Sequence, residues 1–334
     1  MMAGKFFSLS IILLLIFTSA QGSDTIFEPE IVGTIRPKYE YSTNTDEHRF
    51  QLRNARFSVQ GKFSEIVSYK AEIDLSDEGV TKMLDAYVRF QTKEWYKFTI
   101  GQQKIPFSTD NLRSPHQLYF ANRSFIGKQL TSGLRDVGAM LELINKETLP
   151  FNFFAGVYNG TGLYNQKSWR KTNEFSYVTR LELKPADFWG LSLNFNSIQP
   201  VNIRMNLYNA GVFLNMQNFH FEAEYYYKTY QNSNYDPTHG YFAIVCYDIN
   251  VSEDKILKRI KPVLRYDMMS DNYSFNVYGD VINDVERSRI TGGLTFSLDK
   301  PYLNDIRLNY EQYFYADNFD NCDNKIVLEF VVRF

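Results

Sequence analysis

The feature that most constrains this 334-residue chain is the alternation of long and short links between amphipathic segments. Runs of 9 to 14 residues, in which apolar and polar side chains alternate, recur from residue 30 to the last residue. A period of two is typical of a β-strand with two different faces. The pattern predicts sixteen strands, over residues 30–43, 48–61, 64–77, 80–92, 95–105, 135–146, 149–160, 174–185, 190–198, 204–217, 219–230, 238–250, 259–270, 287–299, 304–317 and 324–334.

The links separate into two classes by their order in the chain. The odd-numbered links include stretches of 29 and 16 residues, at 106–134 and 271–286, whereas no even-numbered link exceeds eight residues. A sheet threaded up and down through a bilayer needs short turns on one side and carries its long loops on the other. A water-soluble sandwich has no reason to keep the two classes apart. We therefore predict an all-β chain that forms a transmembrane antiparallel 16-stranded β-barrel.

The charged faces of these strands must point into the barrel. A Lys or Arg that faces lipid at the bilayer midplane costs about 2–4 kcal/mol. Sixteen strands enclose a lumen too wide to fill with side chains, so an aqueous channel is expected. The inferred lumen faces carry fifteen cations against eleven anions, which predicts a weak preference for anions. Alternatively, most of these charges pair off and only keep the lumen wet. The cations chosen as pore-lining candidates are Arg36, Lys38, Arg56, Lys70 and Arg89.

The two chain ends indicate export and membrane insertion. Lys5 precedes an apolar run over residues 6–17 and then a small-residue stretch, which is typical of a secretory signal peptide and too short for a spanning helix. We expect a signal peptide over residues 1–22, cleaved on export, and a barrel over residues 23–334 in the outer membrane of a Gram-negative bacterium. Phe334 is expected at the periplasmic rim, as membrane anchor and as the C-terminal signal for the barrel-assembly machinery. Outer-membrane lipids are therefore expected partners.

Aromatic residues should collect where the lipid-facing wall meets the headgroups. On the short-turn side the candidates include Trp95 and Phe188. On the loop side the candidates are Tyr158, Tyr230, Tyr266 and Tyr315.

The 29-residue link at 106–134 is a candidate functional segment. Links longer than about 15 residues are usually functional or disordered. This one holds Leu118, Phe120 and Phe125, among other apolar residues that need a surface to pack against. We expect this third extracellular loop to fold into the barrel. Its cations would then form a constriction; an external cap or a subunit contact is the alternative. The candidate constriction residues are Arg113, Arg123 and Lys128, opposed by Asp110 alone.

Other classes of function have little support in the sequence. No Ser/His/Asp arrangement surrounds any of the four histidines, and no clustered Cys and His suggest a metal site. We predict no enzyme activity, no catalytic residue, no metal and no cofactor. The net charge of −2 gives no indication of nucleic-acid binding. The alternative function is a structural or adhesive barrel that binds a partner through its extracellular loops, at 161–173 and 271–286.

Four motifs carry a family resemblance. RFSVQGKFSE, GQQKIPFSTDNL, NRSF and LRDVGAMLE resemble, in order and spacing, the phosphate-selective porin O and P family over residues 30–145. The resemblance implies a 16-stranded outer-membrane porin, commonly a homotrimer, with its third loop folded inward. It implies passive diffusion of small hydrophilic solutes, anionic or neutral, with a weak preference for anions such as phosphate. Two features depart from the family: Asn122–Arg123 replaces an expected Glu–Arg pair, and the lumen lacks a dense arginine ladder.

Overall fold

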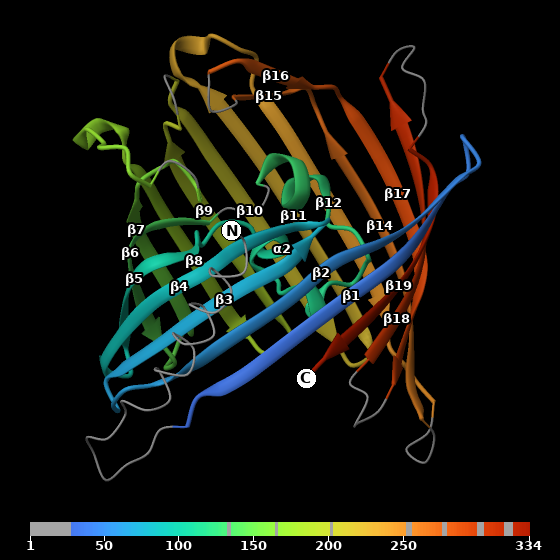
Figure 1. Ribbon diagram of the computed structural model, residues 1–334, viewed down its shortest axis with the longest axis horizontal. Coiled ribbons are helices and arrows are strands. Elements are labelled where there is room, and N and C mark those ends of the chain that lie inside the picture. The colour runs from blue at the N-terminus through green and yellow to red at the C-terminus, as the bar shows by residue number, and fades with distance from the viewer. Residues whose placement is uncertain are drawn as a thin grey trace, which may run out of the picture.

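The barrel is closed and antiparallel, with sixteen strands around its wall (Figure 1). The computed structural model describes residues 28–131, 135–163, 166–200, 203–251, 256–275, 279–298, 304–316 and 323–334. Each strand pairs with the next along the chain, and pairing of the first with the last closes the sheet. The strands are β1 (Glu30–Ser42), β2 (Glu47–Lys62), β3 (Val67–Asp77), β4 (Val80–Lys93), β5 (Tyr96–Lys104), β6 (Arg135–Asn145), β7 (Phe151–Tyr158), β8 (Ser176–Ala186), β9 (Trp189–Ile198), β10 (Met205–Met216), β11 (Phe219–Tyr230), β12 (Thr238–Tyr247) with its continuation β13 (Ile249–Asn250), β14 (Leu257–Met269), β17 (Arg287–Leu298), β18 (Asn304–Tyr315) and β19 (Lys325–Arg333).

This architecture confirms the predicted strand number and the up-and-down threading. The long links, 105–134, 159–175 and 270–286, all leave the same end of the barrel. Within the last of these, β15 (Asn272–Phe275) and β16 (Val281–Asp284) pair as a small hairpin. The sequence did not predict this hairpin, because four-residue strands are too short to show a period. The signal peptide predicted over residues 1–22 lies outside the described residues. Among the described residues, no helix has the length and apolar composition to cross a bilayer.

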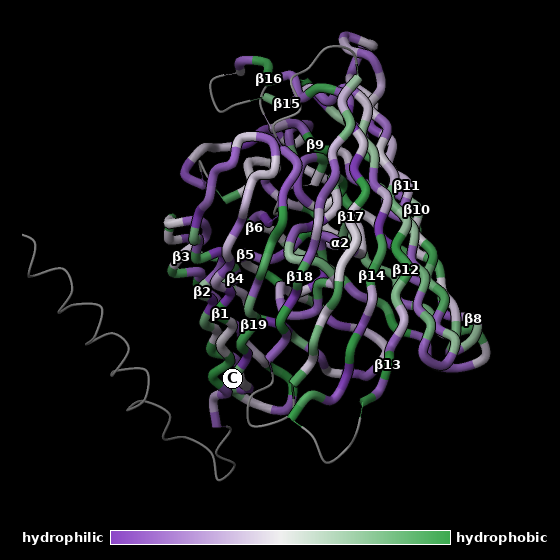
Figure 2. Tube along the Cα trace, turned by 90° about the vertical axis from the view of Figure 1, so that its right-hand side faces the viewer, coloured by the Kyte–Doolittle hydropathy of each residue, from purple (hydrophilic) through white to green (hydrophobic). Residues whose placement is uncertain are grey.

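The two faces of the wall have the predicted polarity. Hydrophobic and hydrophilic residues alternate along the strands in Figure 2. Leu75, Leu193 and Leu264 are each about half exposed on the outside, whereas Asp74 and Glu311 are fully buried on the inside. Lipid covers the first group and the charged interior surrounds the second, so the barrel presents its apolar face to the bilayer.

Phe334 completes the closure of the barrel at the short-turn end. Its backbone N–H donates to the carbonyl of Gly33 at 3.1 Å, and its own carbonyl accepts from the Gly33 N–H at 2.7 Å. The Phe334 ring lies over Gly33, where a Cβ atom would approach the ring to 2.2 Å. Glycine at this position therefore lets the terminal aromatic ring pack against β1.

Three of the predicted interfacial aromatics are wrong. Tyr315 lies on the lumen-facing side of β18 and packs against a cluster of buried apolar residues. Tyr158 and Tyr230 are buried in the barrel rather than exposed to lipid. Tyr158 and Tyr230 both occupy positions whose side chains alternate into the lumen. The prediction had used only their nearness to the long loops. Gly138 and Gly156 leave room for the Tyr158 ring, since a Cβ atom at either would lie 2.6 Å from it.

Because the exposed apolar residues of the wall are assigned to the lipid face, an arginine introduced among them should destabilise the barrel, and more so the deeper it lies in the bilayer. Leu264 lies midway along β14, and Ile249 lies near the short-turn end of the neighbouring strand. Leu264→Arg should lower the free energy of unfolding by about 2–4 kcal/mol and Ile249→Arg by about 0–1 kcal/mol, because only the first buries charge in hydrocarbon. Denaturant titration of the barrel in lipid vesicles measures both, and equal costs would contradict the assignment.

Candidate functional site: a basic conduit along one wall

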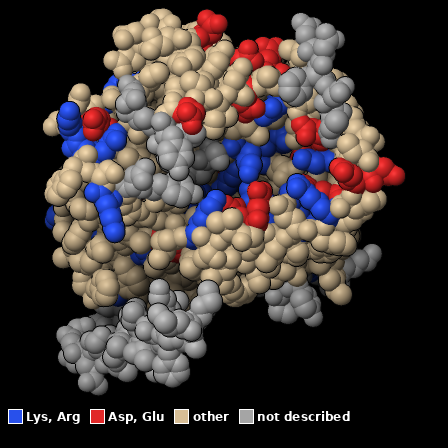
Figure 3. Space-filling model, turned by 45° about the horizontal axis from the view of Figure 1, so that its top comes forward, with Lys and Arg blue, Asp and Glu red and all other residues tan. Residues whose placement is uncertain are grey.

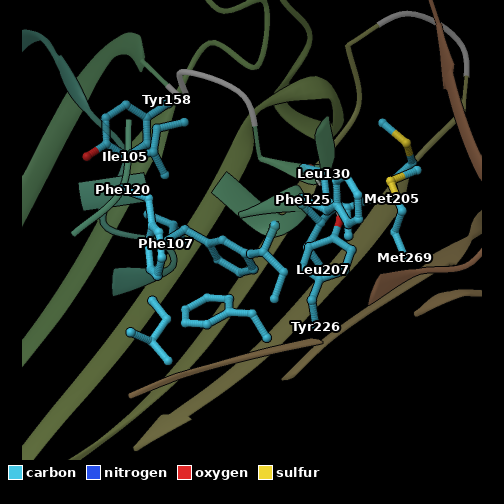
Figure 4. Packing of buried hydrophobic residues seen from close by; sticks show 14 of the residues in the cluster. Ile105, Phe107, Phe120, Phe125, Leu130, Tyr158, Met205, Leu207, Tyr226 and Met269 are labelled. Carbon is cyan, nitrogen blue, oxygen red and sulfur yellow. Dashed lines mark hydrogen bonds between the residues drawn. The ribbon is translucent and has the colours of Figure 1, made fainter. Parts of the chain in front are cut away.

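Residues 105–131 lie inside the barrel, where α2 (Thr109–Leu112) is visible in Figure 1. The segment also contains a 3-10 turn, η1 (Pro115–Gln117), and a π-helical turn, η2 (Ile126–Leu130). Its apolar side chains are almost fully buried and each contributes about 1.5–3 kcal/mol. Figure 4 shows how they pack with inward residues of the wall. The residues of this cluster include Phe107, Phe120, Phe125 and Ile126 from the segment, and Tyr226, Phe242 and Met269 from β11, β12 and β14.

Two buried charges clamp α2 at its ends. The Glu224 carboxylate of β11 accepts from the Ser108 hydroxyl at 2.7 Å and from the Thr109 N–H at 2.5 Å. At the other end the Lys104 ammonium donates to the carbonyls of Asn111 and Leu112, at 3.1 and 3.0 Å. A negative charge at a helix N-terminus and a positive charge at its C-terminus both stabilise it. The clamp therefore ties this irregular segment to opposite sides of the wall.

Four lumen arginines hold the rest of the segment through its backbone. Irregular backbone leaves carbonyls unpaired, and burying them without donors is costly. Each arginine supplies a donor: Arg36 to Ala121 O at 2.7 Å, Arg265 to Asn122 O at 2.9 Å, Arg289 to Arg123 O at 2.8 Å and Arg307 to His116 O at 3.0 Å. All four are at most 3% exposed.

These arginines are also neutralised by buried carboxylates. Glu329 pairs with Arg36 at 2.5 Å and with Arg307 at 2.9 Å. Asp267 pairs with Arg289 at 2.7 Å and accepts the Phe125 N–H at 2.9 Å. These four lumen arginines therefore support the segment.

The space that the segment leaves open lies along β1–β3 and β17–β19. Three cavities follow one another there, with volumes of about 530, 170 and 250 Å³ from the long-loop end inward. Figure 3 shows the hollowed mouth with Lys and Arg side chains inside it. The first two cavities share Glu40, Arg49 and Lys325, and the last two share Arg56 and Pro115. The three cavities thus lie in a row beside the segment, and we call this row the conduit.

The middle cavity is strongly basic. The described residues that line it include nine Lys or Arg side chains and only two carboxylates, Glu40 and Glu78. Each of these carboxylates is shared by two cations: Glu40 by Lys38 and Arg49, and Glu78 by Arg53 and Lys128. Cations therefore outnumber carboxylates in the lining of the cavity. Carboxylates outside the lining also pair with some of these cations, as Glu329 does with Arg36 and Asp267 with Arg289. The nine cations are Arg36, Lys38, Arg49, Arg53, Arg56, Arg123, Lys128, Arg289 and Lys325.

The candidate constriction residues do not all reach this conduit. Arg123 and Lys128 line the middle cavity. Burial, with a further contribution from Arg36, lowers the pKa of Arg123 to about 9, so it remains charged at neutral pH. Arg113 instead points across the lumen to Glu222 of β11, with one N–H to carboxylate distance of 3.1 Å.

The candidate pore-lining residues divide in the same way. Arg36, Lys38 and Arg56 line the middle cavity, and Lys70 lines the third cavity beside Arg56. Arg89 lines none of the three cavities and donates to the Thr99 hydroxyl at 3.1 Å.

Two cavity residues, Arg49 and Arg53, were missed from the sequence. The pairing of β1 with β2 shifts register between Arg36 and Pro37, which leaves Arg53 as an extra residue on β2. Such a bulge reverses which residues of a strand face inward. On the short-turn side of the bulge, even-numbered residues of β2 such as Arg56 face the lumen. From the bulge residue Arg53 towards the loops, odd-numbered residues such as Arg49 face the lumen instead. The signal was Pro37, since proline within a strand marks a bulge or an edge.

His116 occupies the third cavity as a neutral side chain. Its Nε2 lies 3.1 Å from a guanidinium nitrogen of Arg333. Burial, together with the charges of Arg333 and Arg307, lowers the pKa of His116 to about 4.

Anion preference should therefore be constant in this cavity between pH 7 and pH 5, because His116 stays uncharged above its lowered pKa. Arg333→Gln removes one cause of the shift and raises the pKa of His116. In that variant, anion preference should increase as the pH falls through the new pKa. Reversal potentials recorded at several pH values measure both proteins, and a titration near pH 6.5 in the unmodified protein would contradict the neutral His116.

The α2 clamp predicts that Lys104 controls the order of the inward segment. Lys104→Gln removes hydrogen bonds from a charged donor, which contribute about 1.5–3 kcal/mol. Amide exchange over residues 105–131 should accelerate by about tenfold or more, since 1.4 kcal/mol corresponds to a factor of ten. Lys104→Arg should retain most of the protection. The control is Lys97→Gln on the same strand, which pairs with Glu142 and should leave the segment unchanged.

Comparison with known proteins relates this geometry to channel proteins. Residues 36–168 match the family described as phosphate-selective porin O and P. The resemblance seen in the sequence is thus confirmed over this part of the chain. A search of curated proteins finds no match.

Solved structures share the fold at low sequence identity. The outer membrane channel DcaP of Acinetobacter baumannii aligns with a TM-score of 0.65 and 13% identity, over 93% of this chain and 99% of that one. The anion-selective porin from Comamonas acidovorans aligns with a TM-score of 0.64 and 9% identity, over 92% and 100%. OmpT of Vibrio cholerae, in its trimer form, aligns with a TM-score of 0.63 and 10% identity, over 93% and 100%.

The aligned structures thus share the barrel fold with this chain. The chain is a closed 16-stranded barrel with the fold of outer-membrane porins, and its residues 36–168 match the phosphate-selective porin O and P family.

Proposed function

We propose that this barrel is a passive channel for small hydrophilic solutes with a weak preference for anions, and that solutes follow the conduit beside residues 105–131. The observation that carries the proposal is the middle cavity, whose cations exceed and share its carboxylates. Charge lining a narrow pore sets the sign of the ions that it prefers. The preference is weak because every carboxylate of the cavity still neutralises part of that charge.

The constriction belongs to Arg123 and Lys128 rather than to the whole predicted set. Lys128 is about half exposed and its nearest carboxylate, Glu78, is 3.7 Å away. Arg123 approaches the Asp110 carboxylate only to 3.9 Å, but its guanidinium also donates to the backbone carbonyls of Asp110 and Arg113. A passing anion can therefore compete most readily for Lys128. The phosphate preference named in the family description is compatible with this lining, and inorganic phosphate is the solute that we propose first.

We propose further that the molecule is a cleaved, exported homotrimer without enzymatic activity. The apolar run over residues 6–17 supports the signal peptide, and Phe334 at the closing seam supports recognition by the barrel-assembly machinery. The trimer form of the Vibrio cholerae OmpT supports the trimer. His220, the histidine nearest to carboxylates in the sequence, lies 3.4 Å from Glu222, and Glu222 is already held by Arg113.

Charge reversal at Lys128 tests the function. Lys128→Glu should lower the anion-to-cation permeability ratio several-fold, because a unit charge 4 Å away contributes about 1 kcal/mol in water. The effect should be larger at 0.1 M than at 1 M salt, where the Debye length falls from about 10 to about 3 Å. Reversal potentials in planar bilayers, with chloride and phosphate salts of potassium, measure the ratio.

Lys184→Glu is the matched control, since Lys184 is an exposed β8 residue that lines none of the three cavities. It should leave the ratio unchanged. Equal effects of the two reversals would reject the conduit, and discrete conductance steps with a cation preference in the unmodified protein would reject the anion preference.

A further inference from the structure

A groove on the outside of the barrel lies apart from the conduit. It has a volume of about 650 Å³ and crosses the lipid-facing side of β8 to β12. Ala210 forms its floor, and the residues paired with Ala210 on the two neighbouring strands are Leu193 and Tyr225. A small side chain between larger ones leaves a slot that runs into the wall. Leu181 and Phe195 continue its apolar lining.

The loop-side end of the groove has a polar rim. The Tyr225 hydroxyl lies 2.7 Å from Nδ1 of His239, and the Tyr227 ring stacks near the same histidine. Both residues lie towards the ends of β11 and β12 that carry the long loops. Tyrosine and histidine combine an apolar body with a polar tip, which suits the level of lipid headgroups. The apolar part of the groove therefore lies at acyl-chain depth and the rim at headgroup depth.

A basic loop lies directly above this part of the wall. The Tyr177 hydroxyl donates to the Thr172 carbonyl at 2.9 Å. Tyr177 is the outward-facing residue of β8 next to Thr179, which lines the groove. Arg204, next to β10, donates to the Asn173 carbonyl. These bonds hold residues 172–175 over the wall, and the loop extends outward beyond the barrel in Figure 1.

The same loop presents an anchor and two cations. Trp169 is 99% exposed, which is unusual for the largest apolar side chain. Lys167 and Lys171 are exposed on either side of it. Tryptophan favours the membrane–water interface, and lysines close to a membrane surface attract anionic headgroups. An exposed Trp between two cations is a surface suited to a charged lipid.

We propose that this wall binds one phosphate-bearing lipid of the outer leaflet. An acyl chain lies in the groove over Ala210, and its phosphate is held by Lys167 and Lys171, with Trp169 in the interface. The apolar slot and the cations above it match the two ends of such a lipid. A second copy of the chain could also fill the slot, but nothing in the structure identifies an anionic group on it that would pair with Lys167 and Lys171.

Native mass spectrometry of the detergent-purified protein tests the proposal. The probe is bisphosphorylated, hexaacylated lipid A, with its dephosphorylated form for comparison. The phosphorylated lipid should be retained at least about tenfold better, because only it engages the two lysines. Combined replacement of Lys167 and Lys171 by Ala should abolish that difference, and Ala210→Trp should reduce retention of both lipids by filling the slot. Ala71→Trp, on the lipid-facing side of β3, is the matched control and should retain lipid normally.

Two results would overturn the proposal. One is equal retention of the two lipids by the unmodified protein. The other is separation of the oligomer by Ala210→Trp without loss of bound lipid, which would assign the groove to a subunit contact. The conductance and ion preference of Ala210→Trp should be unchanged, so the lipid site can fail while the channel function stands.

Discussion

The arrangement of the lumen depends on one requirement: an irregular segment buried inside a barrel must find hydrogen-bond donors for its carbonyls. Residues 105–131 supply few of their own, because α2 and the two short turns cover little of the segment. The wall supplies them through Arg36, Arg265, Arg289 and Arg307. Guanidinium groups suit this role, since each can bond a carbonyl and a carboxylate at the same time.

This requirement determines where solutes can pass. The segment packs its apolar side against β11, β12 and β14, so the lumen there is filled. The free space is displaced to β1–β3 and β17–β19. Arginines under the segment are neutralised by Glu329 and Asp267, and two of them, Arg36 and Arg289, also line the middle cavity. We propose that the preference for anions arises from the excess of cations over carboxylates in the lining of that cavity.

The strands of the wall were predictable from the sequence because alternate side chains of each strand face lipid and the lumen, which select apolar and polar residues in turn. The sixteen predicted strands differ from the observed ones by a few residues at their ends. Alternation along a strand assigned residues to the wrong face at the bulge beside Pro37, where the strand geometry changes locally. Tyr158 and Tyr230 were assigned by their nearness to the loops, and alternation would have placed both in the lumen. The partners of the inward segment were not predictable: Lys104 and Glu224 are ordinary lumen charges in the sequence, and only the fold brings them to the two ends of α2.

Arg56 has a consequence for how ions move through such a lumen. It stands at the junction of the middle and inner cavities and bonds Asp74 at 2.9 Å, with Glu72 nearby. An anion that reaches this junction would compete with fixed carboxylates for the guanidinium. If the proposed conduit carries anions, their transit is a series of partner exchanges, as on an ion-exchange resin, and its rate should level off once the exchanging cation is always occupied.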